Sequence, residues 1–278
     1  MVGIHDAQQN RRGLTVDFQG KKVVVTGASS GIGAGLAQAL AARGAEVLAV
    51  SRSITPKDLP FDRVTTAQFD LGGKEGIDAL LDFAIERLGI IDLFVANAGY
   101  GYYGRFDTPD WGKMEDIFSL NVFSPVYTLQ KLCNLIPERP FNFAVTASVA
   151  GRLPLPGFSL YCSTKFAVDG FMRAFRYELP HNAYIHVIYP VSTDTAFFEK
   201  SGKDVPAPGP VQPLDEAVEQ IVRGLEAGKK EIYPSKVFTL LNVCSHLCPP
   251  AVTAFLNGEK KRFDDWLVTH NSKKDGTA

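Results

Sequence analysis

A glycine-rich turn between an apolar run and an alanine-rich segment restricts the possible fold of this chain most strongly. Residues Lys22–Thr26 form a β-branched run, which predicts a fully buried strand of a parallel sheet. The turn Gly27–Gly33 follows with the sequence GASSGIG, and the periodic segment Ala34–Arg43 predicts a helix. Glycine lets a backbone approach a pyrophosphate closely, and a helix N-terminus offers free N–H groups and a positive dipole end. The feature therefore predicts a nucleotide site beyond the strand, with a simple tight turn as the alternative.

Further strands and helices are predicted to alternate along the rest of the chain. The predicted strands are Glu46–Ser51, Val64–Asp70, Ile91–Ala96, Phe141–Ala147, Tyr184–Tyr189 and Glu231–Pro234. The predicted helices are Lys74–Leu88, Asp110–Ile136, Tyr161–Leu179 and Leu214–Gly228. This alternation predicts an α/β fold: a single doubly wound, Rossmann-type domain whose mostly parallel seven-stranded sheet carries helices on both faces.

One domain is the expected organisation. The chain has 278 residues, of which 45% are hydrophobic and 21% charged, as in an ordinary globular protein. We expect the domain to span residues 20–268, between polar tails at 1–19 and 269–278, with a substrate loop at 196–213. An apolar helical segment, 236–257, is interrupted by Pro249-Pro250, and its unbroken part is too short to span a bilayer. It could line the substrate pocket, contact a partner subunit or lie on a membrane.

Charge and cysteine content argue against several classes of partner. The formal net charge of −1 gives no basic footprint for nucleic acid, and we expect no transmembrane segment. The first 20 residues lack the apolar core of a secretory signal, so a cytoplasmic location is the default expectation. The four cysteines form no CxxC pair and no histidine stands at a zinc-like spacing, so we expect no metal site.

Tyr161 and Lys165 form the pair that first suggests chemistry. They stand four residues apart in a predicted helix, which places both side chains on one face. A neighbouring ammonium favours the phenolate, so we expect a Tyr161 pKa lowered from ~10 toward neutrality. Such a tyrosine can exchange protons at cellular pH. The same spacing also occurs in pairs that mark only a helix surface.

Residues at the ends of the second and third strands bear on cofactor choice. Ser51 stands where an acidic residue would accept the ribose 2′-hydroxyl, and Arg52 follows it. A guanidinium binds a 2′-phosphate through two donors, so we predict NADP(H) rather than NAD(H). The alternatives are a solvated loop arginine for Arg52 and a surface aspartate for Asp70, which could otherwise accept from an adenine amino group.

Six motifs, in their order along residues 20–235, closely resemble those of the short-chain dehydrogenase/reductase family. They are Thr26-Gly27-x-x-x-Gly31-x-Gly33, Asn97-Ala98-Gly99, Asn121, Ser148, Tyr161 and Lys165. The resemblance implies an NADP(H)-dependent oxidoreductase that interconverts a carbonyl and an alcohol and assembles as a homodimer or homotetramer. A non-catalytic NADP(H)-binding sensor or scaffold with the same fold is the alternative.

The resemblance also assigns four catalytic roles. Tyr161 would exchange a proton with the substrate oxygen, while Lys165 would lower its pKa and bind the nicotinamide ribose. Ser148 would hold and polarise the substrate carbonyl. Asn121 would hold a helix irregularity and a water that links Lys165 to solvent.

A larger set of residues is implied for the cofactor site. Its members are Gly27, Ser29, Ser30, Gly31, Ile32, Gly33, Ser51, Arg52, Asp70, Leu71, Asn97, Ala98, Gly99, Tyr161, Lys165, Pro190, Thr193 and Thr195. Two positions depart from the family pattern. Val191 adds bulk after Pro190 where a glycine is usual, and Ser30 stands where other NADP-binding members carry a basic residue.

Apolar side chains in the loops suggest the kind of substrate. These residues are Tyr102, Tyr103, Leu155, Phe158, Phe197 and Phe198. They favour a lipid, steroid-like or aromatic carbonyl. The run Tyr189–Thr195 is also similar to that of 3-ketosphinganine reductases, although one short run does not assign a substrate.

Overall fold

A seven-stranded sheet forms the centre of the computed structural model, which describes residues 16–236, 238 and 249–271. The strands are β1 Lys22–Thr26, β2 Glu46–Ser51, β3 Val64–Gln68, β4 Leu93–Ala96, β5 Phe141–Thr146, β6 Ala183–Ile188 and β7 Glu231–Ile232. Their order is β3-β2-β1-β4-β5-β6-β7, and every neighbouring pair is parallel. The predicted fold class is thus confirmed, with a sheet that is parallel throughout.

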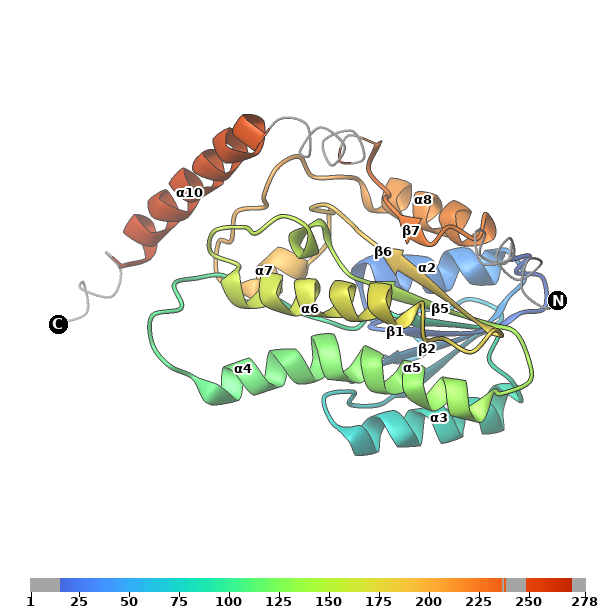
Figure 1. The fold of residues 1–278 in the computed structure, drawn as a ribbon. Helices are drawn as coiled ribbons and strands as arrows, with labels where there is room; N and C mark the ends of the chain where they lie inside the picture. Colours follow the sequence, from blue (N-terminus) through green and yellow to red (C-terminus); the bar gives the residue numbers. More distant parts are fainter. Residues whose placement is uncertain (1–15, 237, 239–248, 272–278) are drawn as a thin grey trace.

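Helices cover both faces of the sheet (Figure 1). On one face lie α2 Gly31–Ala42 and α8 Leu214–Glu226, and on the other lie α3 Lys74–Leu88, α5 Ser124–Leu135 and α6 Ser159–Phe175. α4 Trp111–Phe118 runs into a π-helical turn, Ser119–Phe123, and then into α5. The shorter elements are a 3₁₀ turn at Val149–Gly151 and α7 Phe197–Ser201, and α10 Pro249–Asn271 lies beyond the sheet.

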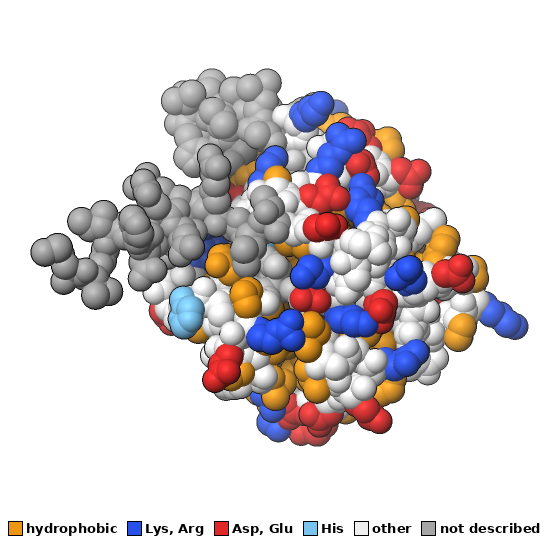
Figure 2. Space-filling model, turned by 90° about the vertical axis from the view of Figure 1, so that its right-hand side faces the viewer, with side chains coloured by type: hydrophobic (Ala, Val, Ile, Leu, Met, Phe, Trp, Pro, Cys, Tyr) orange, Lys and Arg blue, Asp and Glu red, His pale blue; other side chains and the backbone are white. Residues whose placement is uncertain are grey.

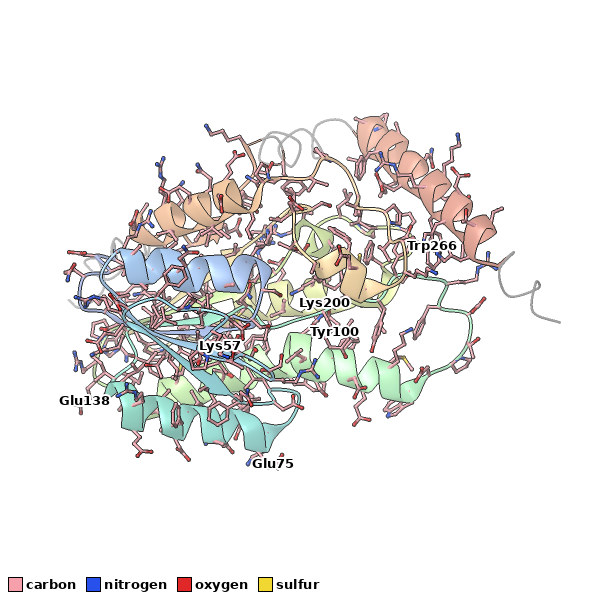
Figure 3. All side chains as sticks on the ribbon, turned by 180° about the vertical axis from the view of Figure 1, so that it is seen from behind. Lys57, Glu75, Tyr100, Glu138, Lys200 and Trp266 are labelled. Carbon is pink, nitrogen blue, oxygen red and sulfur yellow. The ribbon has the colours of Figure 1, made fainter. Side chains whose placement is uncertain are left out.

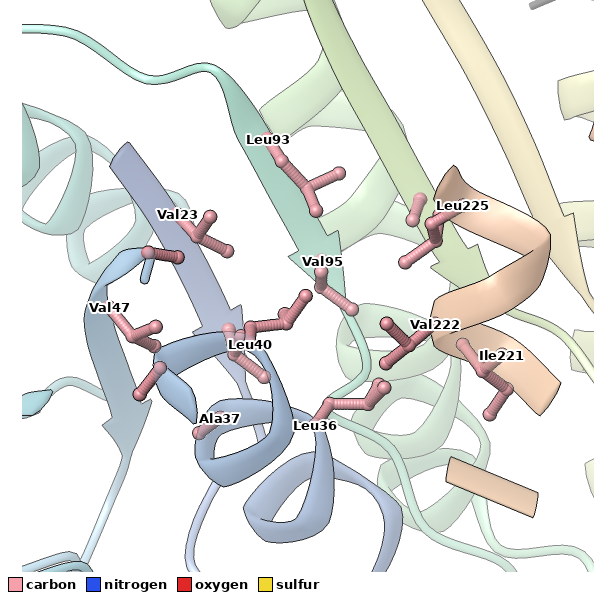
Figure 4. Packing of buried hydrophobic residues seen from close by; sticks show 14 of the residues in the cluster. Val23, Leu36, Ala37, Leu40, Val47, Leu93, Val95, Ile221, Val222 and Leu225 are labelled. Atoms are coloured by element: carbon pink, nitrogen blue, oxygen red, sulfur yellow. The ribbon is translucent and has the colours of Figure 1, made fainter. Parts of the chain in front are cut away.

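Two apolar cores follow from the alternation of side chains along the strands. In β1, Val23 and Val25 face α2 and α8, whereas Val24 faces the layer of α3, α5 and α6. Figure 4 shows the first core, where Leu36 and Leu40 of α2 contact the valines of the sheet. Each such side chain is buried, which stabilises the fold by about 1.5–3 kcal/mol relative to exposure.

The strand order reverses next to β1, which fixes where a ligand can bind. β1 pairs with β2 on one side and with β4 on the other, and the chain crosses the sheet between β3 and β4. The connections that leave β1 and β4 at their carboxyl ends run to opposite faces, so a crevice opens between them.

The domain begins earlier than predicted. Val16 and Phe18 are buried in the core beside α2 and α8, and the Val16 amide donates to the Glu226 carbonyl at 3.1 Å. The predicted tail at 1–19 is therefore wrong for its last residues, because the apolar side chains of Val16 and Phe18 pack into the core although their neighbours in sequence are polar. The remainder of that predicted tail, residues 1–15, lies outside the described residues.

The C-terminal prediction also needs correction. The Pro249-Pro250 pair begins α10, a position where proline is tolerated because the first helical amides lack partners. The helix then runs to Asn271, past the predicted start of the polar tail at 269. Half of the predicted apolar segment, residues 237 and 239–248 with Cys244 and Cys248, lies outside the described residues.

The surface is mixed in charge. On the face drawn in Figure 2, acidic and basic side chains are interspersed, in keeping with the formal net charge of −1. Among the described helices, none combines the length and apolar composition needed to cross a membrane.

Candidate active site

A cavity of about 190 Å³ lies at the carboxyl ends of β1, β4, β5 and β6. Among the predicted site residues it gathers Gly27, Ser30, Gly31, Ile32, Asn97, Gly99, Ser148, Tyr161, Lys165, Pro190, Thr193 and Thr195. These residues come from segments far apart in the sequence. The parallel sheet brings them together because all its strands end at the same edge.

The glycine turn forms a backbone cradle at the start of α2. Gly27 and Gly31 have φ values of +66° and +56°, in the left-handed region that favours glycine. A Cβ atom on Gly33 would lie 2.3 Å from the Gly27 carbonyl oxygen, so no side chain fits there. The first amides of α2 therefore face open space at its N-terminus, and this cradle fits a pyrophosphate.

A hydrogen-bonded brace holds the ends of β1, β4 and β5 together beneath the cavity. The Thr26 hydroxyl accepts from the Asn97 and Ala98 amides at 3.0 and 3.1 Å. The Asn97 side chain donates to the Thr26 carbonyl at 3.1 Å and accepts from the Thr146 hydroxyl at 3.0 Å. Asn97 is thus fixed by three strands.

Tyr161 and Lys165 share a face of α6, as predicted, and both line the cavity with Ser148. The Lys165 ammonium lies 5.6 Å from the centre of the Tyr161 ring and donates to the Thr146 carbonyl at 2.8 Å. Ser148 is the residue before the 3₁₀ turn, and its hydroxyl accepts from the Ala150 amide at 3.1 Å. One apolar-walled site thus holds a phenol, an ammonium and a hydroxyl.

The expected lowering of the Tyr161 pKa is wrong for the protein alone. Burial raises the pKa of Tyr161, and a side-chain hydrogen bond with Ser148 opposes this only in part. Burial also lowers the pKa of Lys165 to about 8. Burial disfavours the charged form of both the phenol and the ammonium. The Lys165 ammonium donates to the Thr146 carbonyl, so its attraction to a Tyr161 phenolate does not offset the effect of burial.

Asn121 lies in the π-helical turn, which agrees with the predicted helix irregularity. Its side chain donates to the Tyr100 carbonyl at 2.9 Å and to the Thr164 hydroxyl at 3.1 Å, and accepts from the Tyr100 amide at 3.1 Å. A Cβ atom on Gly99 would stand 3.0 Å from the side-chain oxygen of Asn121 and 3.7 Å from the ammonium nitrogen of Lys165. Asn121 therefore joins α6 to the loop after β4, close to Lys165.

The other predicted residues lie outside the cavity lining: Ser29, Gly33, Ser51, Arg52, Asp70, Leu71, Ala98 and Asn121. Arg52 is exposed directly after β2, and its charge lowers the pKa of Tyr100, although burial raises that pKa overall. Asp70 accepts from the Gly72 amide at 3.0 Å and helps to shape the turn before α3. Ser51, Arg52, Asp70 and Leu71 lie at the ends of β2 and β3, where an adenosine half of a dinucleotide would lie.

The predicted substrate loop contains a helix that sequence periodicity missed. α7 places the Phe197 ring 5.3 Å from the Tyr161 ring, and Phe158 lies 5.9 Å from Tyr161 on another side. Thr195, just before α7, contacts Gly31, since a Cβ atom there would lie 3.0 Å from the Thr195 methyl carbon. The loop after β6 therefore covers the cavity like a lid.

Several cavity residues were missed from the sequence, and two of them, Thr146 and Lys200, carry polar side chains that form hydrogen bonds at the site. The Lys200 ammonium, on α7, donates to the Ser30 hydroxyl at 3.1 Å. A lysine in a loop with many polar residues carries no signal of its own. Thr146 stands next to the last residue of the predicted strand Phe141–Ala147, and that placement at the carboxyl edge of the sheet was the available clue.

Apolar residues extend the site toward α10. Leu155, Phe158, Phe197 and Phe198 line the cavity as predicted, whereas Tyr102 and Tyr103 do not. Tyr103 instead contacts Phe158, Phe263 and Trp266 at ring distances of 4.7, 5.4 and 5.0 Å. A second cavity, of about 530 Å³, shares Leu155 with the first and includes Leu256 of α10.

In the residues that the structure describes, no three His, Cys, Asp or Glu side chains gather to hold a metal ion. The parallel sheet, the glycine cradle at the switch in strand order and the cavity beside it define a dinucleotide-binding protein of the Rossmann class. The short chain dehydrogenase family model matches residues 21–206. The chain belongs to the short-chain dehydrogenase/reductase family, whose members are oxidoreductases that use NAD(H) or NADP(H).

Two relatives are similar in sequence, and a solved structure has the same fold. The chain is 32% identical over 201 residues to mouse 3-ketodihydrosphingosine reductase, a match that covers 67% of this chain and 60% of that protein. It is 29% identical to the chicken hydroxysteroid 11-beta-dehydrogenase 1-like protein, over 78% of this chain and 79% of that protein. A short chain dehydrogenase from Burkholderia cenocepacia in complex with NADP has the same fold, with a TM-score of 0.73 and 24% identity over 87% of this chain and 99% of that one.

Proposed function

We propose that the protein is an NADP(H)-dependent oxidoreductase that interconverts a carbonyl and an alcohol on an apolar, lipid-like substrate. The observation that carries the proposal is the convergence of Ser148, Tyr161 and Lys165 on one cavity beside the glycine cradle. The named relatives act on a sphingoid ketone or resemble a steroid dehydrogenase, which supports a lipid-like substrate.

The cofactor would occupy the crevice at the ends of β1 and β4. The amides of the Gly27–Gly33 turn would bind its pyrophosphate, and Asn97 would contact its adenosine ribose. Lys165 would bind the nicotinamide ribose, and Pro190 and Thr195 would face the nicotinamide. When bound, the cofactor supplies or accepts the hydride.

Arg52 supports the preference for NADP(H). Its guanidinium follows β2 directly and is exposed, so it is free to bind a 2′-phosphate through two donors. Ser51, at the end of β2, brings no carboxylate to repel that phosphate. Both features favour the phosphorylated cofactor.

The side chains in the cavity divide the chemistry between them. Ser148 would donate to the substrate carbonyl oxygen and hold it near Tyr161. Tyr161 would give that oxygen its phenolic proton on reduction and take it back on oxidation. The Lys165 ammonium would favour the resulting phenolate, an effect that grows when water is excluded by Phe158 and Phe197.

The apolar lining supports the choice of substrate class. Leu155, Phe158, Phe197 and Phe198 surround the reactive groups, and the second cavity continues from Leu155 toward Leu256. An alkyl or steroid-like body would bury apolar surface there, and each buried methylene is worth about 0.8 kcal/mol. We also propose a homodimer or homotetramer and a cytoplasmic location.

A substrate screen tests the proposal. NADPH oxidation would be followed with alkyl ketones of increasing chain length, steroid ketones and aromatic ketones, and each active ketone would be repeated with NADH. We expect turnover with NADPH on at least one apolar ketone and weaker turnover with NADH. If NADPH binds tightly while every ketone fails, the proposed activity is wrong, and a cofactor-binding sensor or scaffold becomes the better account.

A further inference from the structure

The short helix α7 directs side chains toward two different parts of the site. Phe197 contacts the ring of Tyr161, and Phe198 faces Phe158 at a ring distance of 6.2 Å. Lys200 points the other way and donates to the hydroxyl of Ser30 at the start of α2. Figure 3 shows Lys200 between α7 and the N-terminal end of α2. One helix thus contacts both the catalytic tyrosine and the glycine turn.

The surroundings of Lys200 leave most of its hydrogen-bonding capacity unused. An ammonium has three donors, and Lys200 uses one of them on Ser30. Within residues 16–236, 238 and 249–271, no carboxylate forms an ion pair with Lys200. Ser30 is the residue before α2 and its side chain caps no amide of that helix. The exposed ammonium therefore lies beside the N-terminal turn of α2, and its other two donors are open to water or to a ligand.

The exposed Lys200 ammonium lies at a place where an anion would be attracted both by the lysine and by the helix. The N-terminus of α2 is the positive end of the helix dipole, so a second positive charge there is repelled. An anion bound by the first amides of α2 would reverse the sign of that interaction. The glycine cradle is shaped for such an anion, because side chains at Gly27 and Gly33 would collide with neighbouring backbone.

We propose that Lys200 binds the cofactor pyrophosphate from the lid side, opposite the amides of α2. The inference rests on the proposed dinucleotide site and adds a residue on α7 to it. It also has a mechanical consequence, because α7 carries Phe197 against Tyr161. A pyrophosphate held by Lys200 would fasten α7 over the catalytic residues, so that cofactor binding closes the cavity around the substrate.

The test is a direct binding measurement. The dissociation constants of NADPH and NADH would be measured by calorimetric titration for the intact protein, Lys200→Ala and Lys200→Arg. Because both dinucleotides contain the pyrophosphate, we expect Lys200→Ala to weaken both equally, by about tenfold. Lys200→Arg should restore most of the affinity, and the difference between wild type and Lys200→Ala should shrink as salt concentration rises.

Lys203→Ala is the matched control. Lys203 follows α7 and is exposed but does not line the cavity, so its loss removes the same charge from the lid without removing the contact. We expect its binding constants to equal those of wild type. Unchanged binding in Lys200→Ala, or an equal loss in Lys203→Ala, would overturn the inference. A loss for NADPH alone would also overturn it, because it would assign Lys200 to the 2′-phosphate.

Hydrogen exchange provides a second readout. NADPH should slow amide exchange in residues 196–208 of wild type, and this protection should be lost in Lys200→Ala at saturating NADPH. Equal protection in both proteins would contradict the fastening of α7. If wild type binds neither dinucleotide, the proposed cofactor site itself is wrong. That outcome differs from one in which wild type binds both and Lys200→Ala binds them equally well.

Discussion

Gly33 lies so close to Gly27 that a Cβ atom at position 33 would stand 2.3 Å from the Gly27 carbonyl oxygen. The same atom would stand 2.5 Å from the Asn97 side-chain nitrogen. The close packing of Gly33 on Gly27 sets the path of the turn that precedes α2. That turn directs the backbone amides of the glycine cradle toward the cavity. Packing of backbone on backbone thus shapes the cofactor site directly.

Gly33→Ala should therefore damage both the fold and the cofactor site. The added methyl would collide with the Gly27 carbonyl and with the hydrogen-bonded Asn97 side chain, so we expect a loss of about 1–3 kcal/mol in unfolding free energy. Affinity for NADPH should fall with it, because α2 must shift away from the turn. Urea unfolding and NADPH titration measure the two effects.

Gly170→Ala is the matched control for that substitution. Gly170 is exposed within α6, and a Cβ atom there meets nothing within 4 Å. We expect this variant to be stabilised by roughly 0.5–1 kcal/mol, because alanine favours a helix. If both substitutions had the same effect, the contact at Gly33 would not be what holds the turn.

The pKa of Lys165 predicts a pH dependence of cofactor use. Burial lowers that pKa to about 8, so in the free protein Lys165 loses its charge as the pH rises through this value. The ratio kcat/KM for NADPH reports the free enzyme, and we expect it to fall above about pH 8. In Lys165→Arg the guanidinium stays charged, so the falling limb should disappear even if the maximal rate is lower. Identical profiles would contradict a role for this ammonium.

The same shift affects stability in a defined direction. The pKa of Lys165 is lower in the folded protein than its ordinary value of 10.5, so between pH 8 and 10.5 the unfolded chain binds more protons. The contribution of Lys165 to stability therefore rises with pH across this window. Lys165→Met should lack that rise, which urea unfolding at several pH values would reveal.

Arg52→Ala should change cofactor preference. Loss of a charge-assisted contact to the 2′-phosphate costs about 1.5–3 kcal/mol, so we expect NADPH to bind at least tenfold more weakly. NADH should be nearly unaffected, since it has no phosphate at that position. Titration with both cofactors checks this, and an equal loss for both would remove the basis of the NADP(H) assignment.

A buried ion pair behind the site should be sensitive to substitution. Arg152, just after the 3₁₀ turn that Ser148 begins, lies 3.1 Å from the Asp169 carboxylate on α6. Tyr189 also donates to Asp169. We expect Asp169→Asn to lower the unfolding free energy by about 1–3 kcal/mol, because Tyr189 and Arg152 both lose a charged acceptor while Arg152 keeps Glu231 as its remaining carboxylate partner.

Asp78→Asn is the comparison for that pair. Asp78 binds Lys74 and Lys131 at the surface, where water screens both charges, so its loss should have far less effect. Thermal unfolding of both variants would test the difference. A larger effect at Asp78 would mean that the Arg152 cluster contributes little to holding Ser148 against α6.

The fold and much of the site were open to prediction because their signals are local. β-branched runs, helical periodicity and glycine positions specify the strands and helices, and a parallel sheet places all strand ends at one edge. The spacing of Tyr161 and Lys165 predicts a shared helix face, and the family resemblance adds Ser148 at the end of a predicted strand. The helix irregularity at Asn121 was implied by the family resemblance, whereas periodicity predicted one helix over Asp110–Ile136.

The missed features depend on contacts between segments distant in sequence. Phe18 and Val16 are buried only because α2 and α8 offer a core to them. Lys200 meets Ser30 across 170 positions, and no periodicity encodes that contact. The pKa of Tyr161 was misjudged because spacing shows a neighbouring charge but not the burial that opposes it. The Pro249-Pro250 pair predicts a break in an apolar helix, although the same residues also suit a helix start.

Carbonyl reduction with and without the Tyr161 hydroxyl tests the central claim most directly. NADPH oxidation by wild type and Tyr161→Phe would be compared on the best ketone of the screen, with NADPH affinity measured for both. We predict that kcat/KM for the ketone falls at least a hundredfold in Tyr161→Phe, because a positioned proton donor contributes about 10²–10⁴ in rate, while NADPH affinity is retained. Full activity in Tyr161→Phe would contradict the account.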